Sequence, residues 1–140
     1  MVFTYRTLNQ RPSRPECSIS VSNPSELSRS RNINAIVDSG ADMTCIPESV
    51  IQALGSLIQG EIGLRDVNGN VAARYIYVVE LNIFSNITRR VEVLSIPKDN
   101  ALIGRDILNE YKIVLDAPST IWRLNCREIC KSTSPGENGD

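Results

Sequence analysis

The sequence of 140 residues contains no histidine. Histidine is the usual general base of serine and cysteine hydrolases, and it supplies the metal ligands in the zincin motifs. Its absence therefore excludes triads of the usual kind and histidine-based zinc proteases. A catalytic group in this chain has to be a carboxylate, a hydroxyl or a lysine.

Cysteine is scarce, with Cys17, Cys45, Cys126 and Cys130 spread along the chain. Four are too few for a disulfide framework in a protein of this length, so we expect reduced thiols. Cys126 and Cys130 are spaced so that they could supply two zinc ligands, but no histidine is present to complete a common set. We expect no metal and no cofactor, and a redox or zinc module is the weakest interpretation.

An excess of one charge is also missing, because 15 basic and 16 acidic residues leave a formal net charge of −1. This balance argues against nucleic acid or an anionic membrane as partner. The amino terminus MVFTYRTLNQ has no apolar signal core, and the most apolar stretch, YIYVVELNIF, is interrupted by Glu80 and is too short to span a membrane. We expect a cytoplasmic protein with a single domain.

Alternating apolar residues predict an all-β domain over residues 17–125. Before it, the prolines of RPSRP favour a flexible arm over residues 1–16, and after it KSTSPGENGD favours a polar tail over residues 126–140. SNPSELSRSR, residues 22–31, has loop composition. Two short helices are expected, one begun by Pro47 and closed by Gly55, the other after Gly104. Strands are predicted at 17–21, 31–37, 89–96, 112–116 and 119–124, in a short apolar stretch that runs into Gly104, and in a long hairpin after residue 57.

The centre of that hairpin is Asn68-Gly69, the pair that a two-residue type I′ turn prefers because both positions need positive φ. Residues 65–73 are then the tip. Along the second arm one face is apolar at period two, and it consists of Val71, Ala73, Tyr75, Tyr77, Val79, Leu81 and Ile83.

One acidic residue interrupts the apolar pattern in INAIVDSGADMTCIP, residues 33–47. Asp38 directly follows Ala35-Ile36-Val37 and has no basic neighbour, so its charge would be costly at a buried strand end without hydrogen-bond donors. Asp38 therefore either caps a turn or is a reagent.

Two motifs, AIVDSGA at 35–41 and ALIGRDIL at 101–108, make the chain resemble the retroviral-type aspartic peptidases over roughly residues 15–125. The resemblance implies a closed β-barrel-like acid protease fold with a hairpin flap and one or two short helices. Members of this family pair two carboxylates that share one proton and activate a water. Because Asp-Ser-Gly occurs once here, the resemblance implies a C2 homodimer that cleaves extended polypeptides.

Carried over residue by residue, the resemblance gives each matching position a role. Asp38 would be catalytic, and Ser39, Gly40, Gly104 and Arg105 would support the active-site loop. An ion pair between Arg105 and Asp42 would join the two motifs, with a cost of a few kcal/mol on breaking it if it is buried. Substrate would contact Ala41, Asp42, Val67, Asn68, Gly69 and Asn70. The alternative is a catalytically inactive module of the same fold that binds peptides or supports assembly.

Overall fold

The computed structural model describes residues 1–55, 58–84 and 87–126, and within them the chain is mostly β, as expected. The two helices of this part are short and follow strands: α1 (Glu48–Leu54) and α2 (Arg105–Leu108). A 3-10 turn, η1 (Ala117–Ser119), lies between the last two strands. The strands are β1 (Val2–Arg6), β2 (Arg14–Asn23), β3 (Glu26–Val37), β4 (Cys45–Pro47), β5 (Ile58–Arg65), β6 (Val71–Ile83), β7 (Ile87–Ile96), β8 (Ala101–Ile103), β9 (Tyr111–Asp116) and β10 (Ile121–Cys126).

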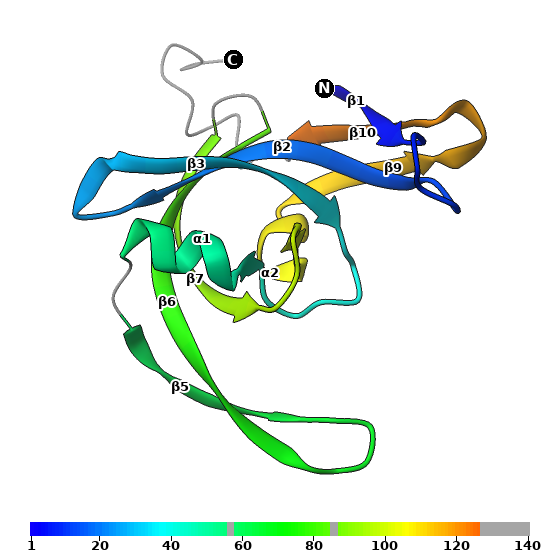
Figure 1. Cartoon of the computed structure of the whole chain (residues 1–140). Coiled ribbons are helices and arrows are strands. Elements are labelled where there is room, and N and C mark those ends of the chain that lie inside the picture. Colours follow the sequence, from blue (N-terminus) through cyan, green and yellow to red (C-terminus); the bar gives the residue numbers. More distant parts are fainter. Residues whose placement is uncertain (56–57, 85–86, 127–140) are drawn as a thin grey trace, which may run out of the picture.

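The strands join in the order β5-β6-β7-β4-β8-β3-β2-β1-β10-β9, and β6 also pairs with β2. The pairings therefore return on themselves through β6, β7, β4, β8, β3 and β2 (Figure 1). Two pairs in this circuit are parallel, β3 with β8 and β4 with β7. The parallel pairing of β3 with β8 brings the ends of the two sequence motifs together, since Val37 lies opposite Ile103.

The buried core is built from the alternating faces of these strands. Val79, Leu81 and Ile83 of β6 are buried, as the period-two pattern predicts. The Trp122 ring is also fully buried, and it stacks on Phe3 with 4.3 Å between ring centroids. The indole Nε1 of Trp122 also donates to the Glu16 carbonyl, which satisfies its one polar atom.

The amino-terminal residues are a strand, which corrects the expectation of a flexible arm over residues 1–16. β1 pairs with β10 and with β2, and β2 begins at Arg14. The physical reason is the alternation of Phe3 and Tyr5: Tyr5 is buried in the core, and Phe3 packs against it. Residues 127–140 of the expected tail lie outside the described residues.

Residues 22–31 are also more ordered than their composition indicates. β2 and β3 form a long hairpin whose turn is limited to Pro24 and Ser25. Ser22 pairs with Ser30 in this ladder, and the exposed face of such a hairpin accepts polar residues without loss of pairing. By contrast, α1 ends where expected, because Gly55 caps it at φ 66.

The β5–β6 hairpin extends away from the rest of the fold (Figure 1). This position explains why the apolar face of β6 is only partly covered: Tyr77 is half-buried, whereas Val71, Ala73 and Tyr75 are exposed. No helix of the described residues is long and apolar enough to cross a membrane.

Candidate active site

The loop that carries Asp38 begins where β3 ends and is fixed by backbone hydrogen bonds. The Asp38 amide donates to the Ile103 carbonyl of β8 at 3.0 Å, and the Ala41 amide donates to the Asp38 carbonyl at 3.2 Å. The Gly40 amide donates to Oδ1 of Asp38 at 2.9 Å. The half-buried carboxylate is therefore held through one oxygen, by a turn that is itself anchored to β8.

The junction between β8 and α2 is hydrogen-bonded to this loop. The amides of Arg105 and Asp106 donate to the carbonyls of Ala41 and Asp42, at 2.9 and 3.3 Å. Gly104 is buried at the closest approach, since a Cβ there would lie 2.6 Å from the Met43 carbonyl carbon and 2.8 Å from its oxygen. The structure thus joins the two sequence motifs through main-chain contacts that only glycine permits.

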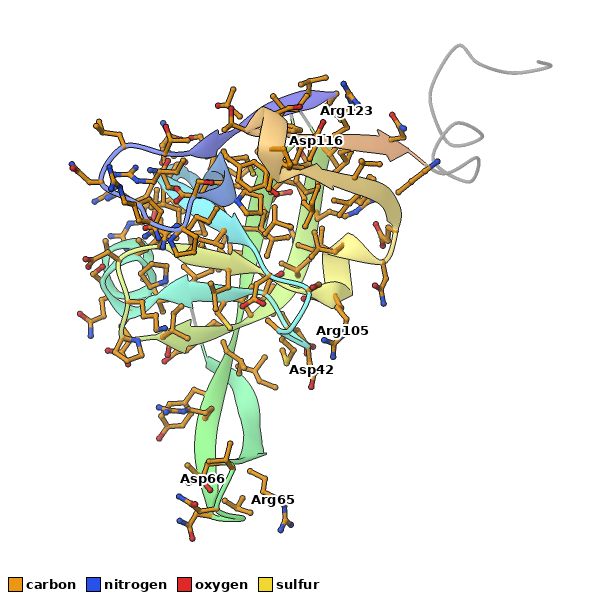
Figure 2. All side chains as sticks on the ribbon, turned by 90° about the vertical axis from the view of Figure 1, so that its right-hand side faces the viewer. Asp42, Arg65, Asp66, Arg105, Asp116 and Arg123 are labelled. Carbon is orange, nitrogen blue, oxygen red and sulfur yellow. The ribbon has the colours of Figure 1, made fainter. Side chains whose placement is uncertain are left out.

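Arg105 and Asp42 form the expected ion pair, and both lie on the same side of the molecule in Figure 2. The second guanidinium nitrogen, Nη1, donates to the Ser39 carbonyl at 2.6 Å. The pair is not buried in this chain, however, because the side chains are 42% and 84% exposed. In the single chain it stabilises the fold by about 1 kcal/mol at most, less than a buried pair would.

Sequence reasoning missed two residues of the site, Thr44 and Asp106. Both oxygens of the Asp106 carboxylate accept from Thr44, Oδ2 from the amide at 3.0 Å and Oδ1 from the hydroxyl at 2.8 Å. The Thr44 hydroxyl in turn accepts from the Gly104 amide at 3.2 Å. The sequence showed Asp106 as part of the motif GRD. It contains several serine and threonine residues, however, so only the fold identifies Thr44 as the hydrogen-bond partner of Asp106.

The hairpin tip differs from the expected two-residue type I′ turn. Its loop has three residues, Val67, Asn68 and Gly69, and the Gly69 amide donates to the Asp66 carbonyl at 3.1 Å. Gly69 has φ 85, while Asn68 is not among the residues with positive φ. This is the type I turn followed by a left-handed residue that three-residue hairpins favour. In Figure 2 the tip, marked by Asp66, lies apart from Asp42 and Arg105.

The family model described as "gag-polyprotein putative aspartyl protease" matches residues 28–110, more than half of the chain. This range contains both motifs and the hairpin between them. The chain belongs to the retropepsin-like aspartic proteases. Asp38, Gly104 and Arg105 all lie within the range that the family model matches.

Solved retropepsin-like structures have the same fold. A retropepsin-like aspartic protease from Rickettsia conorii is 18% identical, with 90% of this chain and 89% of that chain covered and a TM-score of 0.57. EIAV protease in complex with the inhibitor HBY-793 is also 18% identical, covering 70% and 88%, with a TM-score of 0.51. A foamy viral protease-reverse transcriptase is 21% identical over 68% of this chain but only 12% of its own length, with a TM-score of 0.50. No curated protein matches the chain significantly.

A buried cysteine, Cys45, lies near Asp38 and Asp106. The Cys45 thiol donates to the Met43 carbonyl at 3.4 Å. Burial raises the pKa of this thiol, and the negative charges of Asp106 and Asp38 raise it further. Because only the thiolate is an effective nucleophile or metal ligand, Cys45 is chemically quiet at neutral pH. The described residues contain no group of three or more Cys, Asp and Glu side chains able to hold a metal.

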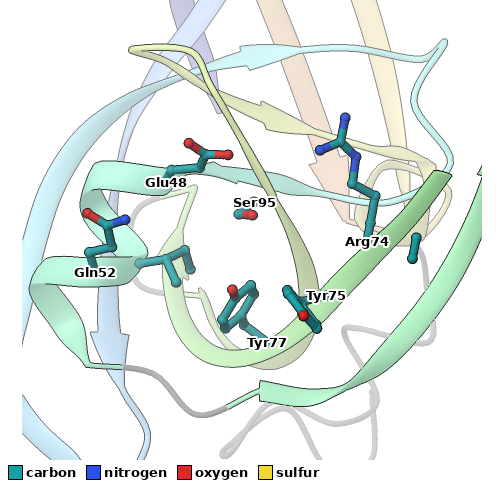
Figure 3. Close-up of a pocket in the computed structure, with 8 residues that line it drawn as sticks. Glu48, Gln52, Arg74, Tyr75, Tyr77 and Ser95 are labelled. Carbon is teal, nitrogen blue, oxygen red and sulfur yellow. The ribbon is translucent and has the colours of Figure 1, made fainter.

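A pocket of about 350 Å³ lies at the base of the hairpin, between α1 and β6 (Figure 3). Tyr75 and Tyr77 of β6 form one wall, and Glu48 and Gln52 of α1 form the other. None of the lining residues belongs to the Asp38 loop. The pocket is therefore formed by α1 and the β6–β7 part of the sheet, not by the Asp38 loop.

Proposed function

We propose that two copies of this chain form a C2 homodimer that acts as an aspartic endopeptidase, with one Asp38 from each copy. The observation that carries the proposal is the single Asp-Ser-Gly loop, with its half-buried acid fixed at one oxygen, in a chain of the retropepsin-like family. One carboxylate cannot act as general base and general acid at once, so a second copy has to supply the other.

The chemistry follows from two carboxylates a few ångströms apart, which hold one proton between them. The charged member removes a proton from a bound water, which attacks the scissile carbonyl, and the protonated member donates to the developing oxyanion. Gly40 fits this task because it lets the backbone come close to the acids. Ser39 has a hydroxyl that can bond across the dimer axis, and neither a metal nor a cofactor is needed.

Extended polypeptides are the proposed substrates. A β-hairpin and a groove edge can both pair with the backbone of an extended chain. We assign the hairpin tip, Val67 to Asn70, to one side of the substrate and Ala41 and Asp42 to the other. The projection of the hairpin beyond the rest of the fold supports this assignment, because it leaves the tip free to cover a bound chain.

The proposal is tested by incubating the protein with a diverse peptide mixture at several pH values and reading cleavage by mass spectrometry. Activity should follow a bell-shaped acidic profile, since one acid must be charged and one protonated. The Asp38→Asn variant should remain folded and lose turnover, while Asp116→Asn, at the end of β9, should behave as wild type. Equal cleavage by both variants would contradict an enzymatic role of Asp38.

A mixing experiment tests whether the site is shared between two chains. If wild-type protein is mixed with an equal amount of Asp38→Asn and the subunits exchange, about half of the wild-type chains will be in mixed dimers. Activity should then fall to about half of that of the wild-type protein before mixing. A larger excess of the variant should lower it further. Activity that stays proportional to the wild-type chain alone would mean that each chain carries its own complete site.

A further inference from the structure

The tip of the β5–β6 hairpin is not supported by the body of the protein (Figure 2). Val67 is completely exposed there, and a Cβ at Gly69 would meet nothing within 4 Å. Packing therefore cannot fix the conformation of this segment. Its shape has to come from hydrogen bonds within the tip itself.

Those bonds converge on Asp66. Its Oδ1 accepts from the Asn68 amide at 2.8 Å and from the Asn70 amide at 2.9 Å. Its own amide donates to the Asn70 carbonyl at 2.8 Å, and its carbonyl accepts from the Gly69 amide at 3.1 Å. One side-chain oxygen of Asp66 thus accepts hydrogen bonds from the middle and from the end of the loop. The tip contains only one glycine, so its conformation depends strongly on these bonds.

We propose that Asp66 is a positioning residue for the peptidase reaction proposed above: it holds the tip in one shape, so that Val67 is presented to the substrate. The inference rests on the proposed function and adds a residue to it. A tip that is already ordered loses less conformational entropy when it covers a bound chain. Without the two side-chain bonds, that ordering has to accompany substrate binding.

The test compares Asp66→Ala, which removes both acceptor bonds, with Asp66→Asn, whose amide oxygen can still accept them. Asp116→Ala is the matched control, because Asp116 Oδ1 also accepts a turn amide, from Ser119 at 3.3 Å. Figure 2 shows Asp116 at the opposite end of the molecule from Asp66. The three variants are measured by amide hydrogen exchange at Asn68 and Asn70, by peptide cleavage kinetics and by thermal unfolding.

In Asp66→Ala we expect faster exchange of both tip amides and an increase of about tenfold in KM with little change in kcat, since the lost bonds order the tip before chemistry. Asp66→Asn should restore both readouts toward wild type, and Asp116→Ala should change neither. Unchanged tip exchange in Asp66→Ala, or unchanged KM despite faster exchange, would overturn the inference. An inactive wild-type protein would instead overturn the proposed function, while exchange would still report whether Asp66 holds the tip.

Discussion

Replacing Gly104 by alanine tests how tightly the two sequence motifs are joined. The new methyl group would lie 2.6 Å from the Met43 carbonyl carbon, 2.8 Å from its oxygen and 3.0 Å from the Ala41 oxygen. Ordinary contacts are about 3.5–4.0 Å, so the backbone has to move by about 1 Å. These neighbours are main-chain atoms of the segment that follows Asp38 and cannot rotate away. Gly104 has φ −91, so backbone strain at the residue itself adds nothing.

The cost has two parts. Forcing a methyl group into a filled site costs about 1–3 kcal/mol. The displacement also strains the bond from the Arg105 amide to the Ala41 carbonyl, which adds about 1 kcal/mol. A total of about 2–4 kcal/mol should lower Tm by roughly 6–12 °C in a chain of this size.

The assay is thermal and urea unfolding followed by circular dichroism. Gly60→Ala in β5 is the matched control, because a Cβ there meets nothing within 4 Å. This control should unfold within a degree or two of wild type. If Gly104→Ala unfolded at the same temperature as Gly60→Ala, the close approach between the β8–α2 junction and the Asp38 loop would be refuted.

Two further predictions concern charge and pH. Arg105→Lys should change the unfolding free energy of the separated chain by less than about 1 kcal/mol, because its ion pair with Asp42 is exposed. In analytical ultracentrifugation the same variant should show a weaker proposed dimer. A dimer affinity equal to that of wild type would mean that Arg105 has no part in dimerisation. The pKa of the Cys17 thiol is raised to about 12 from 9.0 by burial and by Glu16. The folded state therefore favours the protonated thiol, so its contribution to stability is complete below pH 9 and is lost as the pH rises toward 12. Cys17→Ala should flatten this alkaline fall in Tm, and an identical fall in both proteins would assign it to another group.

The meeting of the two motifs at the Asp38 loop was predictable because its signals are local. An apolar strand that stops at Asp38 and a glycine-arginine pair after another apolar strand are visible in the sequence, and the fold brings both together through β3 and β8. The capping role of Gly55 was predictable for the same reason, since the end of a helix needs a residue that tolerates positive φ.

The missed features depend on distant partners or on competing local rules. β1 becomes a strand because Phe3 meets Trp122, which is more than a hundred residues away in the chain. At the hairpin tip, Asn68-Gly69 favours a two-residue turn, but the carboxylate of Asp66 accepts two tip amides and stabilises a three-residue loop instead. The exposure of the Arg105–Asp42 pair was also beyond the sequence, because burial is a property of the assembled surface.

The arrangement around Asp106 shows how a single chain fixes its own Asp38 loop before the proposed dimer forms. Its carboxylate holds Thr44 by two bonds, and Thr44 holds the Gly104 amide, so the segment after Asp38 and the segment after β8 are fixed to each other. The Asp38 amide is tied to β8 as well, through the Ile103 carbonyl. A loop fixed at both ends in the single chain loses little conformational freedom when a partner approaches. In the proposed dimer, the free energy of association is then not needed to fold the loops that carry the two Asp38 residues. It is available for aligning the two acids and for closing the hairpins on the substrate.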